Sequence, residues 1–130
     1  MREVNKMCYT IGQTSEKIEL SIDTLRYYEK EGLIIPKRDS NNRRVFDETD
    51  IKWIEFIKRL KETGMRLADI KTYAKLREQG EETIEERLVL LTQQTSVLLD
   101  KQQELANNLA FLDKKIALYQ EMLTKNTQIS

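Results

Sequence analysis

The strongest constraint on the fold is an unbroken apolar repeat in the C-terminal third of the chain. From residue 84 to residue 123 the spacing alternates between four and three, with only Thr95 and Gln102 polar. The repeat is Ile84, Leu88, Leu91, Thr95, Leu98, Gln102, Leu105, Leu109, Leu112, Ile116, Tyr119 and Leu123. No glycine or proline interrupts it, so the pattern predicts one helix about 60 Å long that enters a coiled coil.

This stripe needs a partner, because a small preceding domain cannot cover a helix of that length. Each buried leucine contributes roughly 1.5–3 kcal/mol, so an exposed seam would be costly. A homodimer is the economical solution, although periodicity alone does not set the orientation of the two helices. We expect the dimer contacts to include Leu88, Leu91, Leu98, Leu105, Leu109, Leu112, Ile116 and Tyr119.

Charge is distributed unevenly along a chain whose 22 basic and 22 acidic residues cancel. Residues 1–80 hold 17 basic against 14 acidic residues, a net charge of +3, and residues 81–130 carry the opposite excess. A single cysteine excludes an intramolecular disulfide framework and fits a reducing compartment. No apolar run is long enough to span a bilayer, so we expect a cytoplasmic protein without membrane contact.

Two short capped helices are predicted near the N-terminus. Thr10 and Gln13 form a capping box, and Ser21 is placed to cap a second helix that ends near Gly32. Only a tight turn at Glu19 separates them, which favours a helix-turn-helix. The second helix presents an arginine and two tyrosines that can contact phosphates or base edges.

A basic hairpin follows this pair of helices. Residues 35–46 have a turn-forming centre at Asn41-Asn42 between short extended segments with four basic residues, which predicts a β-hairpin wing. Further on, Asp47 is expected to cap a third helix from Glu48 to about Thr63. A fourth helix should follow Gly64 and stop at Gly80, and Thr83 with Glu86 should form the capping box of the long helix.

In this order the motifs resemble the MerR family of transcription regulators. The matching pieces lie within residues 8–77 and are Tyr9 to Gly12, Thr24 to Tyr28, Arg44 to Phe46, Leu60 to Met65 and Ile70-Lys71. The resemblance implies a mainly α fold, with a winged helix-turn-helix head, a small β-hairpin wing and an antiparallel coiled coil. We therefore expect a DNA-binding domain at 8–80, a dimerisation helix at 81–124 and a flexible tail at 125–130.

The resemblance also implies a function. Family members bind pseudo-palindromic promoter operators as homodimers, and the activators bend and untwist an over-long spacer for RNA polymerase. Two residues depart from the family pattern, because Glu19 and Asn42 stand where glycine is common. The Glu19 turn is expected to be mildly strained, since both places favour a left-handed backbone.

Candidate DNA contacts come from the second helix, the wing and the turn after the third helix. Of the adjacent tyrosines, which point about 100° apart, we expect Tyr27 to face DNA and Tyr28 to be partly buried. Arg44 is favoured as a contact, whereas Lys37 is as easily solvated surface. The full set is Thr24, Arg26, Tyr27, Tyr28, Lys37, Arg38, Arg43, Arg44, Lys61, Thr63 and Arg66.

The signal that the protein senses is less constrained. With one cysteine and no histidine, no metal site or other cofactor is expected, and Cys8 is favoured as a packed residue over a redox switch. An aldehyde-sensing branch of the family has a helix cysteine where this chain has Arg59. An unidentified small effector remains open, with Tyr73, Leu76 and Tyr119 as pocket candidates, although packing is favoured for them.

Other protein classes explain less of the sequence. Trp53 and Phe56 are assigned to the core because they lie in an amphipathic helix. A tyrosine nucleophile would need a positioned general acid or base and oxyanion-stabilising groups, and the absence of histidine removes only the commonest acid or base. No catalytic residue is predicted, because the order of the DNA-binding motifs argues against catalysis. A coiled-coil adaptor leaves the basic N-terminal motifs unexplained. The main alternative is a repressor or architectural protein that binds DNA with the same fold but does not remodel a promoter.

Overall fold

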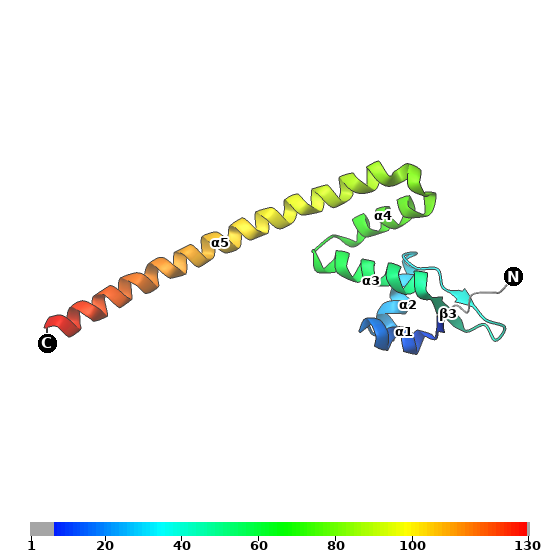
Figure 1. Ribbon diagram of the computed structural model, residues 1–130, viewed down its shortest axis with the longest axis horizontal. Coiled ribbons are helices and arrows are strands. Elements are labelled where there is room, and N and C mark those ends of the chain that lie inside the picture. Colours follow the sequence, from blue (N-terminus) through cyan, green and yellow to red (C-terminus); the bar gives the residue numbers. More distant parts are fainter. Residues whose placement is uncertain (1–6, 130) are drawn as a thin grey trace. The chain divides into compact units, whose positions relative to one another are not determined.

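The computed structural model describes residues 7–129, which divide into two compact units on either side of Leu90 and Leu91. We call residues 7–90 the head and residues 91–129 the stalk. The elements follow in the order β1 (Cys8–Tyr9), α1 (Ile11–Ile18), α2 (Ile22–Lys30), β2 (Lys37–Arg38), β3 (Arg44–Asp47), α3 (Glu48–Glu62), α4 (Leu67–Gln79), the 3-10 turn η1 (Glu81–Thr83) and α5 (Ile84–Ile129). The mainly helical fold with a small sheet confirms the predicted fold class (Figure 1).

Helices α1 and α2 form the predicted helix-turn-helix. The Thr10 hydroxyl accepts the Gln13 N–H at 3.0 Å, and the Gln13 side chain accepts the Thr10 N–H at 2.9 Å, as the predicted capping box requires. Helix α1 ends at Ile18, and the next residue, Glu19, has a φ of 61°, as the expected left-handed turn requires. The Ser21 hydroxyl caps α2, and Gly32 follows with a φ of 80°.

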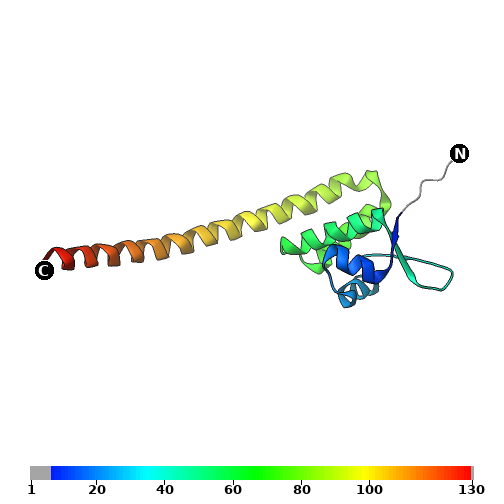
Figure 2. The same ribbon diagram turned by 60° about the horizontal axis from the view of Figure 1, so that its bottom comes forward.

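The sheet has three strands, one more than the predicted hairpin. β2 and β3 pair antiparallel with Lys37 opposite Val45, and β1 adds to the other edge of β3 with Tyr9 opposite Phe46. Figure 2 shows the loop between β2 and β3 projecting from the helices of the head. A two-residue strand gives no alternation to read, which explains why β1 was not predicted.

Helix α3 supplies five of the buried hydrophobic residues of the head, more than any other element that the structure describes. Asp47 is both the last residue of β3 and the N-cap of α3, in a capping box with Asp50. The expected apolar face is buried at Ile51, Ile54, Ile57 and Leu60, with exposed fractions between 0 and 5%. Trp53 is also buried and donates its indole N–H to the Leu33 carbonyl at 2.8 Å, which confirms its assignment to the core.

Helix α4 begins after the turn at Gly64 and returns along α3. Ile70, Tyr73 and Ala74 are buried, so Tyr73 packs within the head. An ion pair between Lys71 and Glu31 joins α4 to the end of α2. These contacts close the head around the α3 core.

Thr83 has a different role from the predicted cap. It lies in η1, is 2% exposed, and donates its hydroxyl to the carbonyls of Leu76 and Gly80 at 2.5 and 2.8 Å. Because these carbonyls belong to the end of α4, the hydroxyl helps to cap that helix rather than starting α5 in a capping box.

Helix α5 is continuous over 46 residues and carries the predicted repeat on its surface. It extends to Ile129, five residues beyond the expected end of the coiled coil. Leu105, Leu109 and Leu123 are between 60 and 66% exposed in the single chain. Among residues 7–129, no helix is both long and apolar enough to cross a membrane.

Stability of the head should depend on the buried face of α3. We expect Ile54→Ala, at a fully buried position, to lower the free energy of unfolding by about 2–5 kcal/mol through lost burial and a residual cavity. Urea denaturation at one fixed protein concentration measures the effect. The exposed neighbour Glu55→Ala is the control, and equal values for the two variants would contradict the assignment of the core.

Candidate nucleic-acid interface

Helix α2 exposes a polar face opposite a buried one. Leu25 and Tyr28 are 1 and 2% exposed, whereas Arg26 is exposed and Tyr27 is 43% exposed. The Arg26 guanidinium lies 3.9 Å from Asp23 in a largely solvated pair, so it is available to a phosphate or a guanine edge. Thr24, partly buried, lies in the first turn, where its hydroxyl is 2.8 Å from that of Ser21.

Burial separates the two adjacent tyrosines. The Tyr28 ring belongs to the core, and burial raises the pKa of its phenol above the ordinary value. Tyr27 meets the Tyr28 ring at a centroid distance of 6.5 Å and leaves its other side open. Tyr28 is therefore a packing residue that supports Tyr27, and Tyr27 remains the candidate contact.

The tip of the wing is organised by Asp39. One carboxylate oxygen accepts the backbone N–H groups of Asn41 and Arg43, both at 2.9 Å. The Asn42 N–H donates to the Asp39 carbonyl, and Asn42 itself has a φ of 61°, as expected from its replacement of glycine. Arg38 donates to the Asn42 carbonyl at 3.2 Å. The side chains of Asp39 and Arg38 therefore hold the shape of the turn through contacts with backbone groups.

Glu29 joins the wing to α2. Its two carboxylate oxygens accept from Arg44 at 2.5 Å and from Arg38 at 3.1 Å, so one residue of α2 orients both strands of the hairpin. The hydrogen bond from Arg44, with the added charge of Arg38, holds the pKa of the Glu29 carboxyl below its ordinary value. The guanidinium groups of Arg38 and Arg44 are thus placed beside α2.

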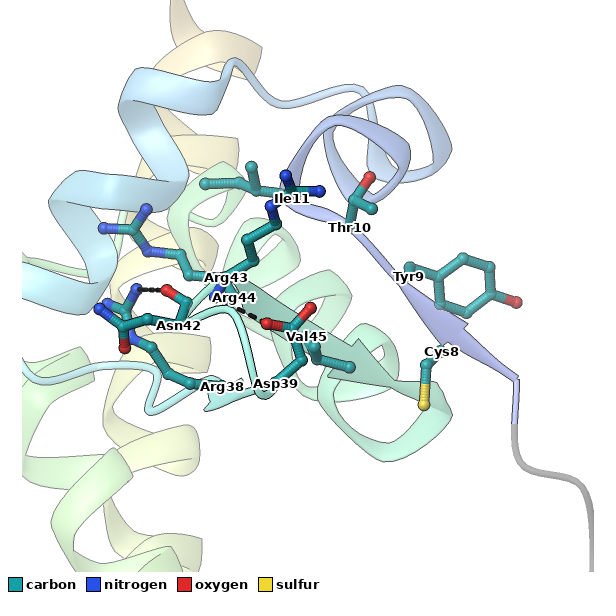
Figure 3. Close-up of a pocket in the computed structure, with 10 residues that line it drawn as sticks. All are labelled: Cys8, Tyr9, Thr10, Ile11, Arg38, Asp39, Asn42, Arg43, Arg44 and Val45. Carbon is teal, nitrogen blue, oxygen red and sulfur yellow. Dashed lines mark hydrogen bonds between the residues drawn. The ribbon is translucent and has the colours of Figure 1, made fainter.

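A cavity of about 420 Å³ lies between β1 and the wing (Figure 3). Arg38, Arg43 and Arg44 line its wing side, and Cys8 and Tyr9 line the other. Asp39 is the one carboxylate among the residues that line this cavity, and it already accepts hydrogen bonds from two backbone N–H groups. Three arginines around an open concavity form a surface suited to the DNA backbone.

The remaining predicted contacts are at the edges of this surface or on the turn after α3. Lys37 is exposed and paired with Asp47 at 3.1 Å, which raises the pKa of the lysine. Lys61 and Arg66 are exposed, with Arg66 beside Asp69. Thr63, partly buried, donates its hydroxyl to the Leu60 carbonyl at 2.6 Å and so caps α3.

Cys8 lies at the surface rather than in the core, contrary to the prediction. Cys8 lies on strand β1 at the edge of the sheet, and the Cys8 thiol is free and exposed. Over residues 7–129, no group of three or more histidine, cysteine, aspartate or glutamate side chains is arranged to hold a metal ion.

Two organising residues were missed by sequence reasoning. Asp39 could have been found, because an aspartate two residues before the centre of a polar turn often binds turn amides. Glu29 has no such local signal. Its partners lie 9 and 15 residues away, on strands whose register relative to α2 is set by packing.

The Glu29 contacts predict a pH-dependent contribution to stability. A carboxylate with a depressed folded pKa stabilises the fold above its unfolded pKa, and this contribution is lost as the pH falls through the folded pKa. We expect Glu29→Gln to lower the free energy of unfolding by about 1 kcal/mol at pH 7. The difference from the natural chain should shrink as the pH falls below 4.5, the ordinary value for this group.

Denaturation between pH 3 and 7 measures this difference, with Glu16→Gln on the exposed face of α1 as the control. The role given to Glu29 would be contradicted if the natural chain and Glu29→Gln had the same free energy of unfolding at pH 7, or if their difference stayed constant down to pH 3.

Comparisons with known proteins agree with this geometry. Residues 9–76 match the family described as MerR HTH family regulatory protein, and residues 51–115 match the one described as MerR, DNA binding. An uncharacterised HTH-type transcriptional regulator of Haemophilus influenzae is 43% identical over 117 residues, which are 88% of this chain and 86% of the relative.

Two solved structures resemble the chain along most of its length. One is HiNmlR, described as a MerR family regulator lacking the sensor domain and bound to promoter DNA. Its TM-score is 0.74 at 43% identity, over 88% of this chain and 87% of that one. A MerR family regulator from Bacillus thuringiensis has a TM-score of 0.72 at 38% identity, over 85 and 98% of the two chains. This chain therefore belongs to the MerR family and is a DNA-binding transcriptional regulator of that type.

Proposed function

We propose that the protein acts as a homodimer that holds two heads on a pseudo-palindromic promoter operator. In each head, α2 enters the major groove and the wing lies on the adjacent backbone. The observation that carries the proposal is the Glu29 bridge, because it sets the wing arginines Arg38 and Arg44 beside the exposed face of α2. One rigid basic surface can then contact a groove and its flanking phosphates together.

The stalk supports the dimeric part of the proposal. The seam residues Leu105, Leu109 and Tyr119 are 64, 60 and 55% exposed, and they recur on one side of α5 at coiled-coil spacing. A second copy offers the same stripe and buries both. The family resemblance supports an antiparallel pairing, which would separate the two heads and match them to two half-sites.

The proposed contacts divide by chemistry. Arg26 and Tyr27 on α2 are the candidates for base edges and nearby phosphates, because they are exposed in the middle of the helix. The wing, Thr24 of α2 and the residues around the turn between α3 and α4 supply charge and hydroxyl groups for the DNA backbone. These backbone contacts are Thr24, Lys37, Arg38, Arg43, Arg44, Lys61, Thr63 and Arg66.

At a promoter, the dimer would act by deforming DNA. Two heads fixed to one stalk can bend and untwist an over-long spacer, so that RNA polymerase reaches both promoter elements. HiNmlR is described as bound to promoter DNA, which supports a promoter as the target. The role is binding and remodelling, with no catalytic step.

Selection from a genomic fragment library tests the function. Purified protein would be mixed with fragments at 50 and 200 mM salt, and the bound DNA sequenced. Inverted repeats inside over-long promoter spacers support the proposal. Inverted repeats elsewhere would favour a repressor or an architectural protein, and unselective recovery would contradict operator recognition.

Loss of an interface cation should weaken DNA binding and leave assembly intact. We expect Arg26→Ala or Arg43→Ala to weaken operator binding about tenfold or more. The slope of log Kd against log salt should fall by about one for each lost phosphate contact. Fluorescence anisotropy measures both. Lys75→Ala, at an exposed lysine of α4, is the control. If Arg26→Ala and Arg43→Ala bind the operator as tightly as Lys75→Ala does, these arginines are not DNA contacts.

A charge in the seam should separate the protomers. We expect Leu105→Asp to convert the dimer to a monomer at micromolar concentration, because the carboxylate would be buried without a partner. Operator affinity should then fall as the two half-sites lose their coupling. Light scattering measures the mass. Gln103→Asp adds the same charge outside the repeat and is the control. If the Leu105→Asp variant stays dimeric, the assignment of Leu105 to the dimer interface is wrong.

A further inference from the structure

A second cavity lies on the head, formed by α3, α4 and the first turn of α5. Its volume is about 370 Å³, and it shares no residue with the cavity at the wing. It is lined by Thr49, Lys52, Trp53, Phe56, Tyr73, Arg77 and Arg87. All of these residues belong to the head, so the cavity exists within one compact unit.

Three aromatic rings form one side of the cavity. Trp53 stacks on Tyr73 with centroids 6.2 Å apart and an interplanar angle of 15°, and on Phe56 at 5.9 Å and 28°. Phe56 and Tyr73 meet at 5.4 Å. The hydrogen bond from the Trp53 indole to the Leu33 carbonyl fixes the central ring. Trp53 and Tyr73 are 9 and 8% exposed, and Phe56 is partly exposed, so a flat apolar group in the cavity would contact mainly Phe56, which the two buried rings hold in place.

Three cations surround these rings. The Arg77 guanidinium lies over the Trp53 ring, 4.2 Å from its centroid. Arg87 donates to the Thr83 hydroxyl at 3.1 Å and to the Gly80 carbonyl at 2.9 Å, which holds its guanidinium at the cavity. Lys52 comes from the second turn of α3 and is exposed. The Thr49 hydroxyl adds a neutral donor one turn earlier.

No carboxylate balances this charge locally. None of the residues that line the cavity is acidic, and the ion pairs found among residues 7–129 do not include Lys52, Arg77 or Arg87. Three like charges around one concavity repel one another, and a bound anion would relieve that repulsion. Packing of the core explains the aromatic rings, but it does not explain why three cations and no carboxylate line the cavity beside them.

We propose that this cavity binds a small planar aromatic anion, such as an aryl carboxylate. The ring would pack against the Trp53, Phe56 and Tyr73 cluster, and the carboxylate would accept charge-assisted hydrogen bonds from Arg77, Arg87 or Lys52. The volume suits one or two fused rings and lies at the small end of the range for ligand sites. The site is independent of the DNA-binding surface.

Titration of the full-length protein with 2-naphthoate tests the site. Trp53 is the sole tryptophan of the chain, so its indole N–H gives one NMR signal that reports on the cavity. We expect 2-naphthoate to shift that signal with a Kd below about 1 mM. The neutral analogue 2-naphthalenemethanol should bind at least about tenfold more weakly, because it lacks the charge.

Variants locate the anion. Lys52→Gln and Arg77→Gln should each weaken 2-naphthoate binding about tenfold, measured by calorimetry, whereas Lys75→Gln on the exposed face of α4 should leave it unchanged. No shift of the Trp53 signal up to several millimolar, equal affinity for the neutral analogue, or unchanged binding by both cavity variants would overturn the proposal.

Operator binding by the same variants separates this site from the proposed function. Lys52 and Arg77 lie outside the proposed DNA contacts, so their variants should bind the operator like the natural chain in the absence of 2-naphthoate. A chain that binds 2-naphthoate but selects no operator would contradict the proposed function alone.

Discussion

Burial of the apolar face of α3 is the constraint on which the head depends. Ile51, Ile54 and Ile57 are at most 1% exposed, and α1, α4 and β3 all pack against this helix. Asp47 ends β3 and caps α3 with no residue between, so the wing is covalently held to the core helix. The Lys58 side chain reaches the Ile18 carbonyl at 2.7 Å and joins α3 to the end of α1. Helix α3 thus positions α2 and the wing, although Lys61 near its end is its sole proposed DNA contact.

Electrostatic contacts then refine what packing has positioned. A single carboxylate, Glu29, orients Arg38 and Arg44 of the wing, and the Asp39 carboxylate shapes the hairpin tip through backbone N–H groups. Partly exposed ion pairs contribute little to global stability, so their main effect here is geometric. Preorganised arginines lose less conformational entropy when they meet phosphate, which favours binding. The carboxylates of Glu29 and Asp39 therefore position the proposed DNA-binding surface.

The fold was largely predictable, because its signals are local. The start of a helix is indicated by the N-cap residue types at Thr10, Ser21 and Asp47, and the buried face of α3 follows from the 3.6-residue spacing of its apolar residues. The errors fall where contacts between elements, rather than a local pattern, decide the environment of a residue. Cys8 was expected to be packed but lies on an edge strand, and the Thr83 hydroxyl binds carbonyls from α4 instead of opening α5. The cation-ringed cavity was not predicted either, since Trp53, Arg77 and Arg87 meet only after α3, α4 and α5 have packed.

Patterns of neighbouring residues were enough to predict the five helices, the β2–β3 hairpin, the repeat along α5 and the family, because caps, periodicity and motif order are local properties. It also placed the candidate DNA contacts on α2 and the wing. The packed fold was needed to show which carboxylate orients the wing arginines and which cations gather around Trp53. These features depend on the register between elements far apart in the chain. That register is set by how side chains fill the core, which no local pattern encodes.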